Sequence, residues 1–291
     1  MPQFVTPGVM GILNVTPDSF ADGGRYFDPD AAIAKGMEMY RQGATLVDVG
    51  GESTRPGAAE VNLAEERRRV LPVVTELARH GAVSIDTRHR DVAEAALEAG
   101  ATMLNDVSAT LWPVAAEAAV AWVAMHSPAP GGSLADMHRV PDATRSLDGV
   151  RDVLAFCRQR AETALAAGVP TVFIDPGLGF GKDVAANLAL VAGLERFVAS
   201  GHPVIVGASR KRFVGAISVP TVPPGQTGPP GRVPEDAQDR LAGSLAVATW
   251  AYTTGVALVR AHDVNATVAA LRLVHEPVPW QVLEGSSEVA A

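Results

Sequence analysis

The chain has 291 residues, of which 47% are hydrophobic and 5% aromatic, enough to bury a large aliphatic core. A formal net charge of −8 excludes a general binder of nucleic acid or anionic membranes, because such proteins present a basic face. Cys157 is the one cysteine, which excludes an intrachain disulfide and indicates a reducing compartment. We find no signal-peptide pattern and no apolar run of membrane-spanning length, and therefore expect a soluble, cytoplasmic protein without nucleic-acid or membrane partners.

Eight short apolar runs, rich in β-branched residues, recur along the chain. They cover residues 9–15, 45–51, 82–87, 102–108, 122–127, 171–177, 203–209 and 256–264. Nearly every position in them is apolar, rather than every second one, which is typical of parallel strands covered on both faces.

Helical patterns with one apolar face lie between these runs. The first begins at Asp28 and Pro29, which suit an N-cap and a first turn, and Gly43 closes it. The others cover residues 63–80, 88–99, 113–120, 147–167, 187–200, 236–254 and 265–274. We expect left-handed C-caps at the glycines that follow several of them, namely Gly81, Gly100, Gly168, Gly201 and Gly255.

Eight strand-helix units in this length predict the α/β class and a single closed (β/α)8 barrel, with long mobile loops at its C-terminal face. No break in composition suggests a second domain, so we expect one domain over 1–291 with its core at about 8–276. Residues 219–234 contain six prolines and three glycines and are predicted to form a surface insertion. Residues 280–291 are predicted to be a frayed tail.

Polar residues gather where the predicted strands end, and in such a barrel these ends face the active site. Asp86, Asn105 and Asp175 come from three strands with apolar surroundings, where unpaired polar groups are costly. Two interpretations remain open. The acids pair with barrel cations such as Lys211, or they bind a heterocycle that is rich in N–H donors.

A second group of strand-end residues is cationic and consists of Arg55, Lys211, Arg260 and His262. It follows strands two, seven and eight, which includes the usual phosphate-binding corner of these barrels. With Thr54 and Ser209 on the same rim it favours a phosphorylated substrate, although a lone arginine there more often belongs to a structural ion pair. Asn14 offers an oxygen to a Mg²⁺ ion carrying pyrophosphate, but one asparagine is a weak metal signal.

Seven ordered blocks of the sequence resemble those of the dihydropteroate synthase family. Two are signature loops, NVTPDSFADGG at 14–24 and DVGGESTRPG at 48–57. The others are SIDT at 84–87, NDVS at 105–108, DPGLGFGK at 175–182, GASRKRF at 207–213 and RAHDV at 260–264. Any one block is unspecific, whereas seven in the family's order are highly specific.

The resemblance implies a transferase of folate biosynthesis that uses Mg²⁺. Such an enzyme condenses 6-hydroxymethyl-7,8-dihydropterin pyrophosphate with p-aminobenzoate to 7,8-dihydropteroate and pyrophosphate, and is the target of sulfonamides. It implies that Asp86, Asn105 and Asp175 hold the pterin edge, with Lys211 at its carbonyl side and Met125 packed nearby.

The resemblance also implies which residues bind the pyrophosphate leaving group and which bind the second substrate. Pyrophosphate and its Mg²⁺ would be bound by Asn14, Thr54, Ser209, Arg260 and His262, with Arg55 in the catalytic set. Asp18 or Asp22 would shield the cationic pterin methylene. The p-aminobenzoate ring would lie against Phe20, Pro56 and Phe180, near Thr54 and Arg212.

Two other functions stay open. A catalytically silent paralogue would bind a pterin without making dihydropteroate, and a pterin-using methyltransferase would not need Phe20, the turn at 55–57 or the pyrophosphate cations. We also expect a homodimer, because the helices predicted at 187–200 and 236–254 carry an excess of apolar residues. These are Leu190, Leu194, Leu245, Val247 and Trp250.

Overall fold

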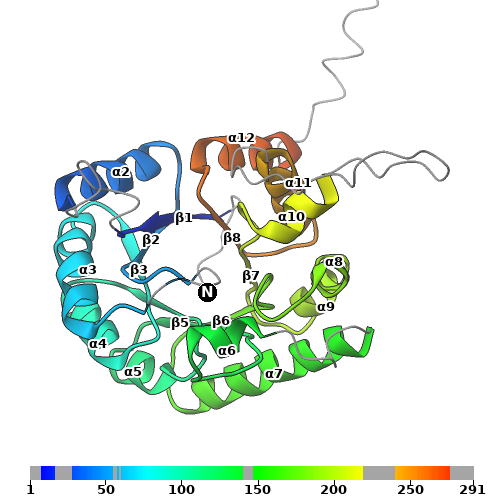
Figure 1. Cartoon of the computed structure of the whole chain (residues 1–291), viewed down its shortest axis with the longest axis horizontal. Coiled ribbons are helices and arrows are strands. Elements are labelled where there is room, and N and C mark those ends of the chain that lie inside the picture. The colour runs from blue at the N-terminus through cyan, green and yellow to red at the C-terminus, as the bar shows by residue number, and fades with distance from the viewer. Residues whose placement is uncertain are drawn as a thin grey trace, which may run out of the picture.

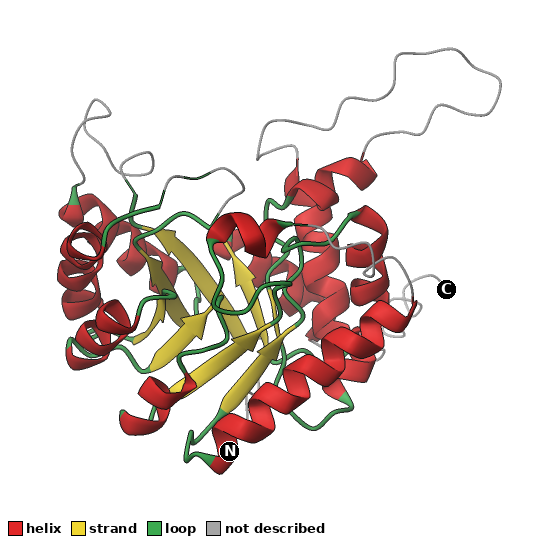
Figure 2. Cartoon of the chain, turned by 60° about the horizontal axis from the view of Figure 1, so that its bottom comes forward, coloured by secondary structure: helices red, strands yellow, loops and turns green. Residues whose placement is uncertain are grey.

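The computed structural model describes residues 8–16, 28–54, 58, 60–139, 147–218 and 240–275. Its eight strands form one parallel sheet in the order β6-β5-β4-β3-β2-β1-β8-β7. A bridge between Ile174 and Val204 connects the two edges, so the sheet is nearly closed. Helices surround this sheet on its outer side (Figure 1 and Figure 2). The prediction of a (β/α)8 barrel is confirmed.

All eight predicted strands are present. They are β1 Gly8–Asn14, β2 Leu46–Gly50, β3 Ala82–Asp86, β4 Met103–Asp106, β5 Ala121–Met125, β6 Val172–Asp175, β7 Ile205–Val206 and β8 Leu258–Ala261. The helices of the described residues are α2 Pro29–Arg41, α3 Leu63–Leu77, α4 Arg90–Glu98, α5 Trp112–Glu117, α6 Leu134–His138, α7 Leu147–Ala166, α8 Val184–Ala192, α9 Leu194–Val198, α10 Arg212–Ser218, α11 Leu241–Thr253 and α12 Val264–His275.

The helix predictions were wrong in two respects. The helix predicted at 187–200 is two helices, α8 and α9, which meet at Gly193. Neither α6 nor α10 was predicted, because five and seven residues are too few to show a helical period.

Gly43, Gly100, Gly168, Gly201 and Gly255 have positive φ angles, as predicted for left-handed caps. The same prediction for Gly81 was wrong, since its φ is not positive. There a Cβ would lie 2.7 Å from the ring of Tyr40, so that position needs glycine because of this close approach.

The inside of the barrel is layered. Its lower layer is an apolar plug built from Met10, Leu46, Met103, Val123, Phe173, Ile205 and Leu258. Side chains two positions apart on a strand point to the same face. The residues two positions nearer the carboxyl ends therefore also face inward, and they include Asp48, Asn105, Met125, Asp175 and Arg260. The polar residues of the predicted site thus lie directly above the plug.

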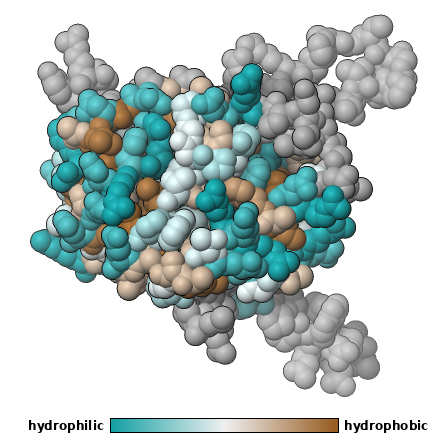
Figure 3. Space-filling model, turned by 90° about the horizontal axis from the view of Figure 1, so that it is seen from below, coloured by the Kyte–Doolittle hydropathy of each residue, from teal (hydrophilic) through white to brown (hydrophobic). Residues whose placement is uncertain are grey.

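The space-filling view shows small hydrophilic and hydrophobic areas mixed over one face of the molecule (Figure 3). None of the helices in the described ranges is long and apolar enough to cross a membrane. The predicted insertion at 219–234 and tail at 280–291 lie outside the described residues, so the assignment of core and appended segments remains a prediction.

Outside the barrel, α3 and the start of α4 are joined by a buried acid. Glu66 is fully buried, and its carboxylate accepts a hydrogen bond from Thr87 Oγ1 at 2.7 Å. Its other oxygen lies 2.6 Å from His89 Nδ1. This hydrogen bond raises the pKa of His89 above its usual 6.5, so the protonated form is favoured in the folded state.

Replacing His89 by Gln should therefore destabilise the fold in a pH-dependent way. The protonated pair contributes fully below pH 6.5 and loses its effect as the pH rises through the raised pKa of the folded state. We expect the variant to lose about 1–3 kcal/mol of unfolding free energy at pH 5.5 and clearly less at pH 9, measured by urea denaturation. An equal loss at both pH values would show that His89 acts only by packing.

Candidate active site

Arg260 lies between two carboxylates inside the mouth of the barrel. Its Nε donates to Asp48 Oδ2 at 2.6 Å, and its Nη2 donates to Asp86 Oδ2. The contact joins β8 to β2 and β3, which lie on the far side of β1. Of the two interpretations left open for Asp86, pairing with a cation is thus present, but the partner is Arg260 rather than Lys211.

Asn105 and Asp175 belong to the same inner layer. Asn105 Nδ2 donates to Asp48 Oδ2 at 3.0 Å, and Asp175 Oδ1 accepts from the backbone N of Gly177 at 2.7 Å. Met125 is paired in register with Asp175 and shares its face of the sheet. The residues predicted to hold a pterin therefore line one wall.

Lys211 enters this layer from the loop after β7. Burial lowers the pKa of Lys211 to about 8, against the attraction of the Asp175 carboxylate. Its Nζ donates to the backbone O of Leu178 and lies 4.9 Å from the centroid of the Phe180 ring. Lys211 thus lies between the acidic wall and an aromatic one.

The inner layer is rich in buried acids. Three carboxyl groups, those of Asp48, Asp86 and Asp175, lie near the cations Arg260 and Lys211, and the charge of the buried Lys182 also acts on Asp175. Burial raises the pKa of Asp86 to about 7, although the charge of Arg260 opposes this shift. A ligand that brings N–H donors would relieve the excess of acceptors.

The rim above β1 and β8 carries a second polar group. Asn14 Nδ2 lies 3.5 Å from His262 Nε2, and His262 Nδ1 lies 3.1 Å from Ser209 Oγ. A cavity of about 460 Å³ opens beside Asn14 and His262, between α2 and the start of α12, and is also lined by Lys35, Arg210 and Asp263. The Asn14 amide, the His262 imidazole and the Lys35 ammonium suit an anionic group, whereas Arg210 is already paired with the Asp263 carboxylate.

Arg210 connects the loops that follow β7 and β8. Its Nε and Nη2 donate to the Asp263 carboxylate at 3.0 and 2.5 Å, and its backbone N donates to Ser244 Oγ at 3.0 Å. These bonds hold Arg210 at a φ of 60°, which is unusual for a residue other than glycine. The constraint fixes its neighbours Ser209 and Lys211.

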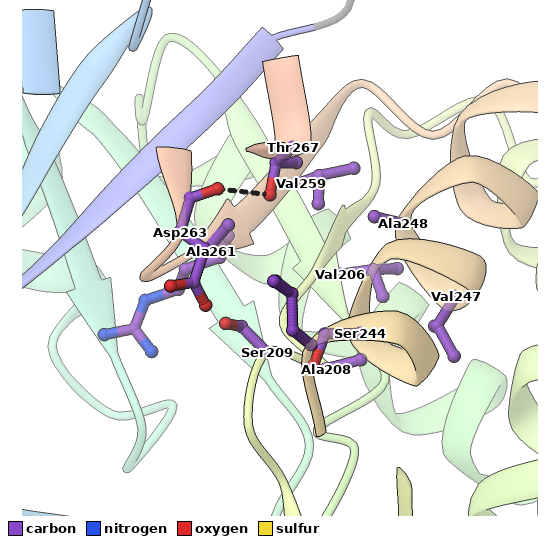
Figure 4. Close-up of a pocket in the computed structure, with 12 residues that line it drawn as sticks. Val206, Ala208, Ser209, Ser244, Val247, Ala248, Val259, Ala261, Asp263 and Thr267 are labelled. Atoms are coloured by element: carbon purple, nitrogen blue, oxygen red, sulfur yellow. Dashed lines mark hydrogen bonds between the residues drawn. The ribbon is translucent and has the colours of Figure 1, made fainter. Parts of the chain in front are cut away.

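Figure 4 shows a much smaller cavity between β7, β8 and α11, close to Ser209 and Ser244. Its volume is about 10 Å³. That is room for about one water molecule at most, so it is not a substrate site.

His138 of α6 contacts two loops on the side of the barrel mouth that carries Phe180. Its ring stacks on Phe180 with centroids 5.0 Å apart and an interplanar angle of 18°, and its Nε2 lies 2.7 Å from the backbone O of Thr54. His138, from the connection after β5, thereby joins the loops after β2 and β6.

Lys182 holds the loop after β6 in place. Its buried Nζ donates to the backbone O of Gly177 and of Phe180 at 2.9 Å, and it lies 3.0 Å from His126 Nδ1. Burial lowers the pKa of Lys182 to about 7 and that of His126 to about 3. Both groups serve the loop that carries Phe180.

Five of the residues named for the predicted site fall outside the described ranges. Phe20, Asp22, Arg55 and Pro56, together with Asp18, lie outside the described residues. Arg212 begins α10 and is exposed.

The comparisons with known proteins agree with this geometry. A family of pterin-binding enzymes matches residues 10–262. The dihydropteroate synthase of Mycobacterium leprae is 44% identical over 91% of this chain and 92% of its own length. The chain belongs to the dihydropteroate synthase family.

Solved structures of this synthase family share the fold. The enzyme of Xanthomonas albilineans with 4-aminobenzoic acid is 39% identical, with a TM-score of 0.78, and the match covers 96% of this chain and 93% of that one. The Thermus thermophilus enzyme in complex with 6HMPPP is 38% identical with a TM-score of 0.72, over 96% and 94% of the two chains. The protein is therefore a transferase of this family.

Sequence reasoning missed three residues that organise the synthase site. Asp48 lies in the block at 48–57 and was given no role, although a charged residue inside a predicted apolar strand is a signal. Lys182 lies in a quoted block without an assigned role. His138 lies in a segment that matched no recognised block and formed no predicted helix, so no signal pointed to it.

Replacing His138 by Ala should weaken p-aminobenzoate binding, because Phe180 loses its stacking partner and Thr54 its hydrogen bond. We expect a roughly threefold to tenfold higher KM for p-aminobenzoate and an unchanged KM for the pterin substrate. His138→Phe, which keeps a stacking ring, should lie between parent and Ala. Equal KM changes for both substrates would contradict a role on the aromatic side alone.

Proposed function

We propose that this chain is an active dihydropteroate synthase. It condenses 6-hydroxymethyl-7,8-dihydropterin pyrophosphate with p-aminobenzoate to 7,8-dihydropteroate and pyrophosphate. The observation that carries the proposal is the inner layer of Asp86, Asn105 and Asp175 beside Lys211, together with the rim group of Asn14, Ser209 and His262 at the carboxyl ends of the strands. A pterin pyrophosphate has the matching halves, a donor-rich ring and an anionic tail.

The ring would enter with its amino edge toward the acidic wall. In the described residues, Asp86 Oδ2 is bonded to Arg260 and Asp175 Oδ1 to Gly177, which leaves the second oxygen of each carboxyl to accept from the ring. Lys211 would donate to the ring carbonyl, and Met125 would pack against the ring. Fixed acceptors and donors of this kind select both the heterocycle and its orientation.

The main catalytic task is to help the leaving group depart. The aniline amine of p-aminobenzoate is a weak nucleophile, so pyrophosphate departure leads or accompanies its attack, and positive charge builds up on the pterin methylene. Donors on the rim, His262 and Ser209 among them, would bind pyrophosphate more tightly as its charge grows. The chain needs no covalent nucleophile for this reaction.

Mg²⁺ fits the rim as a hard cation that prefers oxygen ligands. The Nδ2 of Asn14 faces His262, so its Oδ1 is turned elsewhere and is the protein ligand we propose. A bound Mg²⁺ would supply Lewis-acid stabilisation of the pyrophosphate oxygens.

The guanidinium of Arg260 contributes to this site from below. Two carboxylates, those of Asp48 and Asp86, bind the guanidinium. We therefore propose that Arg260 supports the pterin ring from inside the barrel and also contacts the pyrophosphate. Asp22 and Arg55 remain proposed catalytic groups of the loops after β1 and β2. Phe20, Thr54, Pro56, Phe180 and Arg212 remain the proposed p-aminobenzoate contacts.

Pyrophosphate release from the two substrates with Mg²⁺ tests the proposal. We expect turnover in the parent and a loss of at least about 100-fold in Lys211→Ala and in Asp86→Ala, because each removes a buried contact to the ring. Arg158→Ala, at an exposed position on α7, should keep the parental rate. A chelator should abolish turnover, and added Mg²⁺ should restore it.

Each alternative function has its own outcome. A silent paralogue would bind the pterin without releasing pyrophosphate. A pterin-using methyltransferase would bind a methylated pterin but would not respond to p-aminobenzoate. If Lys211→Ala and Asp86→Ala both release pyrophosphate as fast as the parent protein, the assignment of these two residues to the pterin site is wrong.

We also propose a cytoplasmic homodimer. Part of the original reason is lost, because Leu190 and Leu194 belong to the protein's own core. Support comes from the exposed side chains of Val184, Leu188 and Trp250 on the neighbouring helices α8 and α11. Burying these apolar groups between two copies would favour association.

Light scattering should therefore give twice the chain mass, and Trp250→Glu should shift the protein toward monomer. A monomeric mass for the parent at all concentrations would contradict the dimer.

A further inference from the structure

Asp48 is a buried acid inside the barrel mouth, with 1% of its surface exposed. It belongs to the same inner layer as Asn105 and Asp175, which are assigned to the pterin. Its Oδ2 accepts two hydrogen bonds, from Arg260 Nε at 2.6 Å and from Asn105 Nδ2 at 3.0 Å. One oxygen atom therefore holds two side chains of the proposed pterin site.

The bond from Asn105 determines which end of its amide reaches the ligand. A carboxylate can only accept hydrogen bonds, so the NH₂ group of Asn105 has to face Asp48. The amide oxygen is then turned the other way. With the opposite orientation, Asn105 would present a donor to the ligand and an oxygen to a carboxylate, which repel each other.

The bond from Arg260 has a comparable effect on Asp86. The guanidinium is planar, and its Nε and Nη2 are bound by two different carboxylates. Holding Nε at Asp48 directs Nη2 to Asp86 Oδ2 and thereby orients the other oxygen of Asp86.

We infer that Asp48 is a positioning residue that sets the acceptor pattern of the pterin site through Asn105 and Arg260, and so selects a heterocycle with an edge of N–H donors. This inference rests on the proposed function, because it assumes that the inner layer containing Asp48 binds a pterin ring.

Two substitutions separate the acceptor from the charge. Asp48→Leu has a similar shape and no acceptor, so the Asn105 amide is free to rotate and Arg260 loses one anchor. Asp48→Asn can keep an oxygen at the position of Oδ2, where it accepts both bonds, although the charge is lost. Ser84→Ala is the matched control, because Ser84 is paired in register with Asp48, is equally buried, and its Oγ has no hydrogen-bond partner in the described part of the chain.

The experiment is calorimetric binding of 6-hydroxymethylpterin to each folded protein, together with the KM for each substrate. We expect Asp48→Leu to bind the pterin at least tenfold more weakly and to raise the KM for the pterin substrate, with the KM for p-aminobenzoate unchanged. Asp48→Asn should recover a large part of the affinity, and Ser84→Ala should bind as the parent does.

The outcomes distinguish the two levels of the proposal. A parent that binds no pterin would overturn the proposed function. A parent that binds, with Asp48→Leu binding equally well, would overturn the inference about Asp48 alone. If Asp48→Leu does not fold, Asp48→Asn combined with Asn105→Leu provides the second measurement. The loss caused by Asp48→Asn should become smaller in the Asn105→Leu background, because only the contact with Arg260 then remains, and an unchanged loss there would also overturn the inference.

Discussion

The buried contact of Arg260 with Asp48 and Asp86 is the interaction on which the site depends. Charges this deep are stable only when paired, and removing one partner of such a pair typically costs about 3–5 kcal/mol. The barrel makes the pairing possible, because closure brings β8 next to β1 and within reach of acids on β2 and β3. Fold and site are therefore coupled.

The two layers inside the barrel have different roles. The lower apolar plug provides the hydrophobic core inside the sheet, while the upper layer concentrates acceptors and two cations in a nearly dry environment. In such surroundings, an unmatched hydrogen-bonding group is expensive, and a ligand that supplies the missing donors is bound selectively. The carboxyl oxygens that neither Arg260 nor Gly177 binds give the site its preference for a donor-rich ring.

The sequence predicted the barrel because its signals are local. Continuous apolar runs such as 9–15 and the capped start of α2 at Asp28 can be seen within a few residues. In such a barrel the carboxyl ends of the strands face the active site, which predicts that Asp86, Asn105 and Asp175 lie in one site. Contacts between residues far apart in the sequence were not predictable. Arg260 is separated from Asp48 by 212 positions, and no pattern in either segment names the other as its partner. His138 lies on a five-residue helix that gives no periodic signal.

The most direct test of this account is a crystal structure of the protein with a bound 6-hydroxymethyl-7,8-dihydropterin pyrophosphate or a non-hydrolysable analogue. The account predicts that the amino edge of the ring lies against Asp86, Asn105 and Asp175, and that the pyrophosphate reaches Asn14 and His262. A ring turned with its carbonyl toward Asp175, or bound outside the barrel mouth, would contradict it.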